Sequence, residues 1–149
     1  MSYVRRTHNL QIGEATAERV KMEVGAAVRP PDGKGSKTYV RGRDVTRGVP
    51  GEIELSQAQV ADALAEPVSQ IVEVVRTALE HTQPEIAADV IDQGITMTGG
   101  GSLLRDIATV LEDSTGLSVR IADDPMSCVA LGAGQTLEEQ VLRGALMAA

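Results

Sequence analysis

Aromatic residues are nearly absent from this sequence, which has no tryptophan, no phenylalanine and only two tyrosines, Tyr3 and Tyr39. The core must therefore be built from valine, leucine, isoleucine, alanine and methionine. With 149 residues, the chain is long enough to bury on the order of two-thirds of the surface that its unfolded form exposes. An aliphatic core of this kind suits helices packed on a sheet, and we expect an α/β fold.

Cysteine is almost absent as well, because Cys128 is the only one, which excludes a disulfide within the chain. Cys128 lies in the apolar run 128–131 without a basic residue nearby, so we expect a buried structural thiol rather than a nucleophile. There is no signal-like apolar segment at the N-terminus, and no run is long enough to cross a membrane. The sequence therefore predicts a cytoplasmic location without direct membrane insertion.

The net charge of −7 is distributed unevenly. Residues 1–49 contain ten Lys or Arg and five Asp or Glu, whereas residues 50–149 contain four and sixteen. The acidic character of most of the chain disfavours nucleic acid as a partner. Two interpretations stay open: two ordinary solvated surfaces, or head-to-tail contact between unlike faces of identical subunits.

Apolar periodicity and turn residues divide the chain into helices and strands. A methionine directly before a segment that resembles the last turns of a helix suggests a piece of a longer protein. Ser56 and Gln59 form a capping box that opens the longest helix. We expect helices over residues 3–9, 14–24, from 56, 85–90 and 103–116, hairpin strands over 38–42 and 51–55, and a strand over 118–122. A last helix should begin at residue 124. Its small residues Ala130, Gly132, Ala133 and Gly134 permit close packing on a sheet.

The most informative stretch is residues 94–106, which we expect to form a short buried strand, a turn of three glycines and then a helix. Gly99, Gly100 and Gly101 allow positive φ and leave room for a ligand beside the backbone, and the first turn of the helix presents free N–H groups. The pattern is typical of a nucleotide-binding corner. A tight structural turn is the alternative, because the chain has neither the Walker lysine pattern nor a true Gly-x-Gly-x-x-Gly.

The helix over residues 14–24 carries a polar stripe of Glu14, Glu18 and Lys21 beside its apolar stripe. Two interpretations are again open. The stripe is either a solvated face or a ribose-binding face, in which Glu18 accepts hydrogen bonds from sugar hydroxyls and Lys21 donates.

Taken together, several motifs in collinear order resemble the C-terminal half of MreB, the bacterial actin homologue in the superfamily of actin, heat-shock chaperones and sugar kinases. The resemblance covers about residues 2–139. It is carried by residues 3–10, 12–21, 40–44, 65–68, 98–104 and 124–132.

The resemblance implies part of an actin-like, ribonuclease H-like lobe, with a mixed sheet flanked by helices and a small inserted α+β subdomain. Residues 1–37 and 83–139 would belong to the inner subdomain, 38–82 to the small peripheral subdomain, and 140–149 to a tail that the resemblance does not match. It also implies the residues on the adenosine side of an ATP site, which are Glu18, Lys21, Gly99, Gly100, Gly101 and Leu103.

The function implied by the resemblance is that of a cytoskeletal protein of the rod-shape system, which forms ATP-dependent filaments that organise cell-wall synthesis. The implied cofactor is ATP or ADP with Mg²⁺ in the complete protein, with weak or absent binding by this chain alone. The implied partners are further copies of the protein, a RodZ-type membrane adaptor and the cell-wall elongation machinery, with association to the membrane through filaments and adaptors.

The resemblance further implies that the phosphate loops and the catalytic carboxylates lie in the half of the family sequence that these residues do not match. Phosphoryl transfer depends on positioning and charge stabilisation around the γ-phosphate. We therefore expect no ATP hydrolysis by this chain alone, no catalytic residue and no metal ligand within it. A different function is a stand-alone module that caps or regulates filaments of a complete homologue; an enzyme lobe of the sugar-kinase or chaperone type is a weaker alternative.

Overall fold

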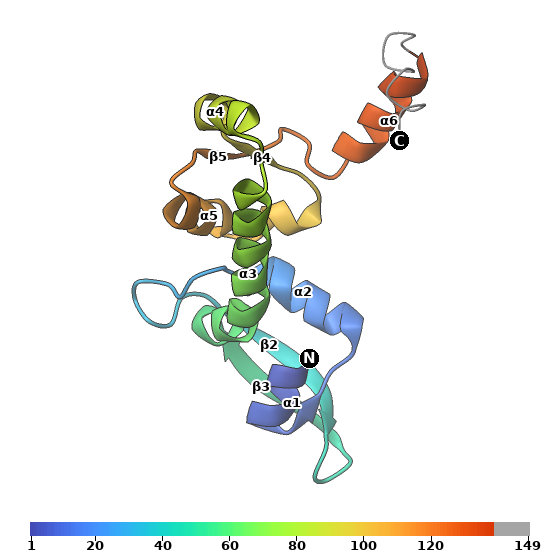
Figure 1. The fold of residues 1–149 in the computed structure, drawn as a ribbon. Coiled ribbons are helices and arrows are strands. Elements are labelled where there is room, and N and C mark those ends of the chain that lie inside the picture. Colours follow the sequence, from blue (N-terminus) through green and yellow to red (C-terminus); the bar gives the residue numbers. More distant parts are fainter. Residues whose placement is uncertain (139–149) are drawn as a thin grey trace.

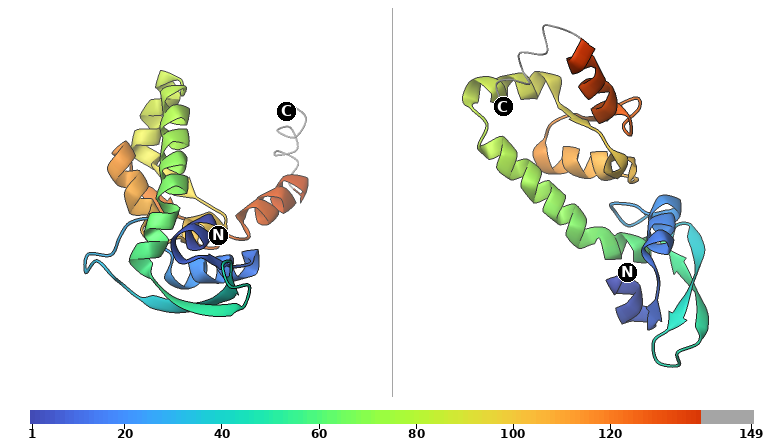
Figure 2. Two further views of the ribbon diagram at one scale, coloured as in Figure 1. Left: turned by 90° about the horizontal axis from the view of Figure 1, so that it is seen from below. Right: turned by 90° about the vertical axis from the view of Figure 1, so that its right-hand side faces the viewer.

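The computed structural model describes residues 1–138, which form two bodies joined by a long helix, α3 (Gln57–Glu80). Figures 1 and 2 show an elongated molecule in which α3 leads from one body to the other. The other elements in chain order are α1 (Ser2–His8), β1 (Leu10–Gln11), α2 (Glu14–Val24), β2 (Lys37–Asp44), β3 (Pro50–Ser56), α4 (Pro84–Gln93), β4 (Ile95–Met97), the 3₁₀ helix η1 (Gly100–Leu103), α5 (Ile107–Thr115), β5 (Val119–Ile121) and α6 (Cys128–Glu138).

The first body, here called the hairpin body, consists of α1, α2 and the antiparallel sheet β1-β2-β3. Strands β2 and β3 pair from Lys37 opposite Ser56 to Arg43 opposite Pro50. Residues alternate between the two faces of a strand, so one face of this sheet is apolar and is covered by helices. The core combines residues of the helices and strands: Val4, Leu10, Ile12, Val20, Val24, Val40, Leu55 and Val60.

The second body, here called the parallel-sheet body, consists of α4, α5 and the two-stranded parallel sheet β4-β5. Its small core contains Ala27, Val68 and Ile107, with Leu64 packed against this core and against that of the hairpin body. The Nη2 atom of Arg76 on α3 donates to the carbonyl oxygen of Ser114 at 2.8 Å. Helix α3 is thus packed in both bodies and holds them together.

Most of the predicted elements are confirmed. Helix α2 ends at Gly25, whose N–H donates to the carbonyl oxygen of Lys21 at 2.9 Å. The capping box is also confirmed, because the Ser56 hydroxyl accepts from the N–H of Gln59 at 3.3 Å and the Gln59 side chain accepts from the N–H of Ser56 at 2.9 Å. The hairpin and the short helix that begins at Pro84 form as expected. The strand expected over residues 118–122 is also present, as β5.

Two predictions about the sheet region are wrong. Strand β4 is not buried, because it pairs with β5 alone among the described residues and this small sheet leaves its residues half-buried or exposed. The helix expected over residues 103–116 begins only at Ile107, because Leu104 is extended and Asp106 has a φ of 64°. Gly99 therefore precedes the 3₁₀ turn η1, Gly100 and Gly101 are its first two residues, and no α-helix begins directly after the glycines.

The last described helix, α6, also differs from the prediction. It begins at Cys128 and not at residue 124, because residues 124–127 form a turn in which the N–H of Ser127 donates to the carbonyl oxygen of Asp124 at 3.2 Å. The expected burial of Cys128 is wrong: the residue is only half-buried, because it begins a helix without buried residues. Its thiol donates to the same carbonyl oxygen of Asp124 at 3.0 Å.

Helix α6 has no buried residue and projects away from both sheets in Figures 1 and 2, so the expected packing of its small residues on a sheet is wrong. Alanine and glycine supply little apolar area, and docking through them alone contributes little hydrophobic free energy. The tail that we expected over residues 140–149 lies outside the described residues. Within residues 1–138, no helix is both long and apolar enough to span a bilayer.

Candidate functional site

Helix α2 presents the first two predicted site residues on its polar stripe. The Nζ atom of Lys21 lies 2.8 Å from Oε2 of Glu18, and their side chains are 41% and 55% exposed. This is an i,i+3 ion pair on a helix surface, where such pairs contribute little to stability. Both groups can therefore exchange this contact for a ligand at small cost.

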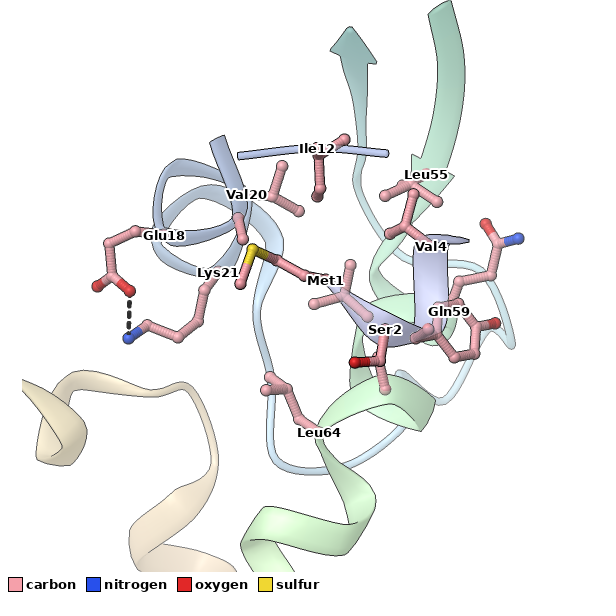
Figure 3. A pocket seen from close by; sticks show the side chains of 14 residues that line it. Met1, Ser2, Val4, Ile12, Glu18, Val20, Lys21, Leu55, Gln59 and Leu64 are labelled. Carbon is pink, nitrogen blue, oxygen red and sulfur yellow. Dashed lines mark ion pairs between the residues drawn. The ribbon is translucent and has the colours of Figure 1, made fainter. Parts of the chain in front are cut away.

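A pocket of about 320 Å³ opens beside this ion pair. Figure 3 shows Glu18 and Lys21 on one side of the pocket and Gln59 on the other. Most of the remaining lining is aliphatic and comes from α1, α2, β3, α3 and the residues next to α1 and β1: Met1, Val4, Ile12, Ala17, Val20, Leu55, Val60, Ala63 and Leu64. Apolar walls with a few polar groups at the rim are typical of a small-molecule site.

The glycine turn lies in the parallel-sheet body and is held by two kinds of contact. Gly99 has a φ of 77°, a conformation that favours glycine, and its N–H donates to the carbonyl oxygen of Pro125 at 2.6 Å. The buried hydroxyl of Ser102 donates to the carbonyl oxygen of Gly99 at 2.7 Å. These contacts fix the turn from both sides.

The space around the turn is open where a ligand would approach. A Cβ atom built on Gly99 or on Gly101 would meet nothing within 4 Å. A Cβ atom on Gly100 would lie 3.2 Å from the sulfur of Met126. Leu103, the last residue of η1, is 60% exposed. The turn thus offers bare backbone and one exposed leucine, flanked by a methionine.

The two predicted parts of the site are joined through the backbone. Ala26, two residues after α2, forms a parallel bridge with Arg105, and the N–H of Ala27 donates to the carbonyl oxygen of Arg105 at 2.8 Å. The end of α2 is thereby fixed beside the segment that follows the glycine turn (Figure 1). None of the three glycines lines the pocket of Figure 3, so the bridge, and not that pocket, connects the two parts.

Met126 is a residue beside the site that the sequence did not indicate. It is 67% exposed and reaches Gly100 only because the turn over residues 124–127 folds back onto Gly99. No spacing or periodicity in the sequence signals this contact, since the two residues come from segments separated by α5 and β5.

The fold and the matched structures define a class of protein, that of the actin-like filament proteins. The structure superposes on MreB5 of Spiroplasma citri bound to ADP with a TM-score of 0.86 at 33% identity, covering 98% of this chain and 43% of that one. The same protein bound to AMPPNP gives a TM-score of 0.85. The MamK filament gives 0.69 at 25% identity, covering 93% of this chain and 41% of that one.

Within this class, the family model described as MreB/Mbl protein matches residues 1–143, and the chain belongs to that family. Over 138 residues the chain is 45% identical to the cell shape-determining protein MreB of Pasteurella multocida, and the match covers 93% of this chain. It spans 39% of the length of that relative. The predicted resemblance and the α/β, actin-like fold class are therefore confirmed.

Proposed function

We propose that this chain supplies the adenosine side of an ATP or ADP site in an actin-like protein of the MreB system. The observation that carries the proposal is the bridge between Ala26 and Arg105, because it holds the C-terminal end of α2, the helix that carries Glu18 and Lys21, beside the segment that follows the glycine turn. The MreB5 structures, which are bound to ADP and to AMPPNP, support a nucleotide as the ligand.

Each predicted residue has a role that its surroundings permit. Glu18 accepts hydrogen bonds from the ribose hydroxyls, and Lys21 donates to the sugar or the base once their surface ion pair opens. Gly99, Gly100 and Gly101 let the ligand lie against bare backbone, and the exposed side chain of Leu103 provides an apolar contact. The open space beside Gly99 and Gly101 leaves room for a group such as adenine or a sugar ring.

We assign the binding of the phosphates and Mg²⁺ to the part of the family's sequence that this chain does not match. Among residues 1–138, no group of three histidine, cysteine, aspartate or glutamate side chains is placed to hold a metal ion. We propose that the chain binds the nucleotide without hydrolysing it. Hydrolysis needs charge stabilisation around the γ-phosphate, and we assign that role to the same unmatched part of the family's sequence.

At the level of the cell, we propose that the complete protein forms ATP-dependent, head-to-tail filaments in the cytoplasm that organise cell-wall synthesis. A RodZ-type adaptor and the wall-elongation machinery are its proposed partners, and they bring the filaments to the membrane. The name of the P. multocida relative and the MamK filament support shape determination and self-association.

The test is a calorimetric titration of the 149-residue chain with ATP and Mg²⁺. We expect saturable binding that Gly100→Val abolishes, because the added side chain occupies the open space at the turn and crowds the sulfur of Met126. Gly132→Ala in the exposed helix α6 is the matched control and should bind normally. A wild-type chain without measurable heat of binding would contradict the proposal.

A second assay addresses the alternative of a regulatory module. The chain is mixed with filaments of a complete MreB, and the pelleted fraction is measured. A change in the pelleted fraction when the chain is added in substoichiometric amounts would favour a filament-capping module. An unchanged fraction would favour the role of a nucleotide-site and contact segment.

A further inference from the structure

A small polar network clamps helix α2 to strand β2 on the side away from the glycine turn. Oε2 of Glu23 accepts two hydrogen bonds, one from Nη1 of Arg19 at 2.7 Å and one from the hydroxyl of Thr38 at 2.9 Å. Nη2 of Arg19 also donates to the carbonyl oxygen of Tyr39 at 3.1 Å. The network therefore holds both a side chain and the backbone of β2.

Two features of this network are unusual for residues that only solvate a surface. Thr38 occupies an inward position of β2 and is 6% exposed, so its hydroxyl needs a partner, which Glu23 provides. Glu23 lies in the last turn of α2, where a negative charge is opposed by the helix dipole. A carboxylate placed there needs compensation, and Arg19 and Thr38 supply it.

The helix has three stripes that must rotate together. Val20 and Val24 are buried against the core, Glu18 and Lys21 form the proposed ribose-binding stripe, and Arg19 and Glu23 form the clamp. Apolar contact is non-directional and tolerates small rotations of a helix, whereas hydrogen bonds of defined geometry do not. The Thr38–Glu23 and Arg19–Tyr39 hydrogen bonds are thus directional contacts that tie the rotation of α2 to strand β2.

We propose that Arg19, Glu23 and Thr38 are positioning residues for the nucleotide site, acting through the orientation of Glu18 and Lys21. This inference rests on the proposed function of that site. A change in the clamp turns the ribose-binding stripe away from the ligand while the apolar core keeps the chain folded.

The test compares ATP affinity in variants of the ¹⁵N-labelled 149-residue chain, followed by NMR titration with Mg²⁺-ATP. Thr38→Val keeps the shape of the side chain but removes the donor, and we expect a loss of affinity of about fivefold, equivalent to one hydrogen bond. Thr38→Ser restores the donor and should return the affinity to within about twofold of wild type. In the free protein, the amide signals of Glu18 and Lys21 should shift in Thr38→Val and return in Thr38→Ser.

Glu52→Gln is the matched control, because it removes the ion pair of Glu52 with Arg41 on the same sheet without touching α2. It should leave both the affinity and the α2 amide signals unchanged. Glu23→Gln provides a second variant if Thr38→Val unfolds: it keeps an acceptor for Thr38, loses the charge that pairs with Arg19, and should also weaken binding.

The outcomes separate the two proposals. A folded Thr38→Val or Glu23→Gln chain that binds ATP as tightly as wild type would overturn the role of the clamp while leaving the nucleotide site in place. A wild-type chain that does not bind ATP would overturn the proposed function and the role of the clamp with it. Loss of affinity in Glu52→Gln equal to that in Thr38→Val would also overturn the role of the clamp.

Discussion

Single residues of the candidate site differ in how far their roles follow from neighbouring positions in the chain. The i,i+3 spacing of Glu18 and Lys21 predicts their proximity, and the structure places them 2.8 Å apart. Glycine at residue 99 predicts positive φ, and its φ is 77°. Met126 reaches Gly100 only through the fold-back of residues 124–127, which no local pattern predicts. Their roles in binding stay predictions.

Met126 should contact the base of a bound nucleotide, because its sulfur lies beside the proposed position of the ligand at Gly100. Thioether–aromatic contacts contribute about 1 kcal/mol, so Met126→Ala should lower the affinity for adenosine by about fivefold, and Met126→Leu, which keeps the apolar volume but lacks the sulfur, should lower it by less. The measurement is NMR of the methionine methyl groups labelled with ¹³C. Adenosine should shift the Met126 signal, and ribose 5-phosphate should not; equal shifts with both ligands would contradict the prediction.

At the scale of elements, the sequence predicted the ends of those helices whose hydrogen-bond partners lie next to them in the chain. The capping box of α3 and the glycine after α2 are local features, and both ends form where expected. The start of α5 was misplaced, because its position depends on the η1 turn and on a positive φ at Asp106. Apolar spacing alone does not report such interruptions.

Ser56→Ala should destabilise the chain by about 1 kcal/mol, because it removes the hydroxyl that accepts from the N–H of Gln59 at the start of α3. Urea denaturation followed by far-UV circular dichroism measures the loss. Ser69→Ala on the exposed surface of the same helix is the matched control and should be neutral or slightly stabilising. Equal effects of the two substitutions would contradict the role of the cap.

The loop between β2 and β3 should be sensitive to acid through Asp44. Backbone N–H groups of Arg47 and Thr46 donate to its carboxylate at 2.9 and 2.8 Å and hold the pKa of Asp44 below its usual 3.8. A folded-state pKa that is lowered gives stability that is present above the unfolded pKa and is lost as the pH falls through the folded pKa. The loop should therefore loosen only below about pH 4.

This acid sensitivity can be followed through the amide signals of Thr46 and Arg47 during a pH titration. Both should move together with a midpoint below 3.8. Asp44→Asn should remove this titration while retaining an acceptor for the two N–H groups. A midpoint at or above 3.8 would contradict the hydrogen-bonding explanation.

At the scale of the whole molecule, two bodies share one long helix, and each has its own core. The opposite charges of the first 49 residues and of the remainder are a property of the sequence, but their use in subunit contacts stays a prediction. The division of the chain at residues 38 and 83 into subdomains also stays a prediction. The two-stranded sheet β4-β5 has free edges among the described residues, and free edges favour pairing with another chain.

The chain should self-associate in solution, and salt should weaken that association. Raising the ionic strength from 0.1 M to 1 M shortens the screening length from about 10 Å to about 3 Å and reduces attraction between unlike surfaces. Sedimentation velocity over a range of protein concentrations measures the effect. A chain that remains monomeric at high concentration and low salt would contradict the prediction.

A substitution separates the charge contribution from that of the sheet edge. Ile121 on β5 is 42% exposed, and Ile121→Lys places a charge on that strand, which disfavours edge pairing. Reduced association of this variant at all salt concentrations would assign the contact to the edge. Association unchanged from wild type would assign it to the charged surfaces.

The sequence by itself determined the aliphatic core, the amphipathic α2 and α3, the hairpin, the capping box and the family resemblance, because each of these depends on residues close together in the chain or on motifs in linear order. Only the tertiary structure decided the half-exposed β4, the late start of α5, the contact of Met126 with Gly100, the bridge of Ala26 with Arg105 and the clamp of Glu23 on Thr38. The last three of these features join segments far apart in the sequence, and local spacing does not encode such contacts. The exposure of β4 and the start of α5 depend on strand pairing and on the backbone conformation of Asp106, which apolar periodicity does not report either.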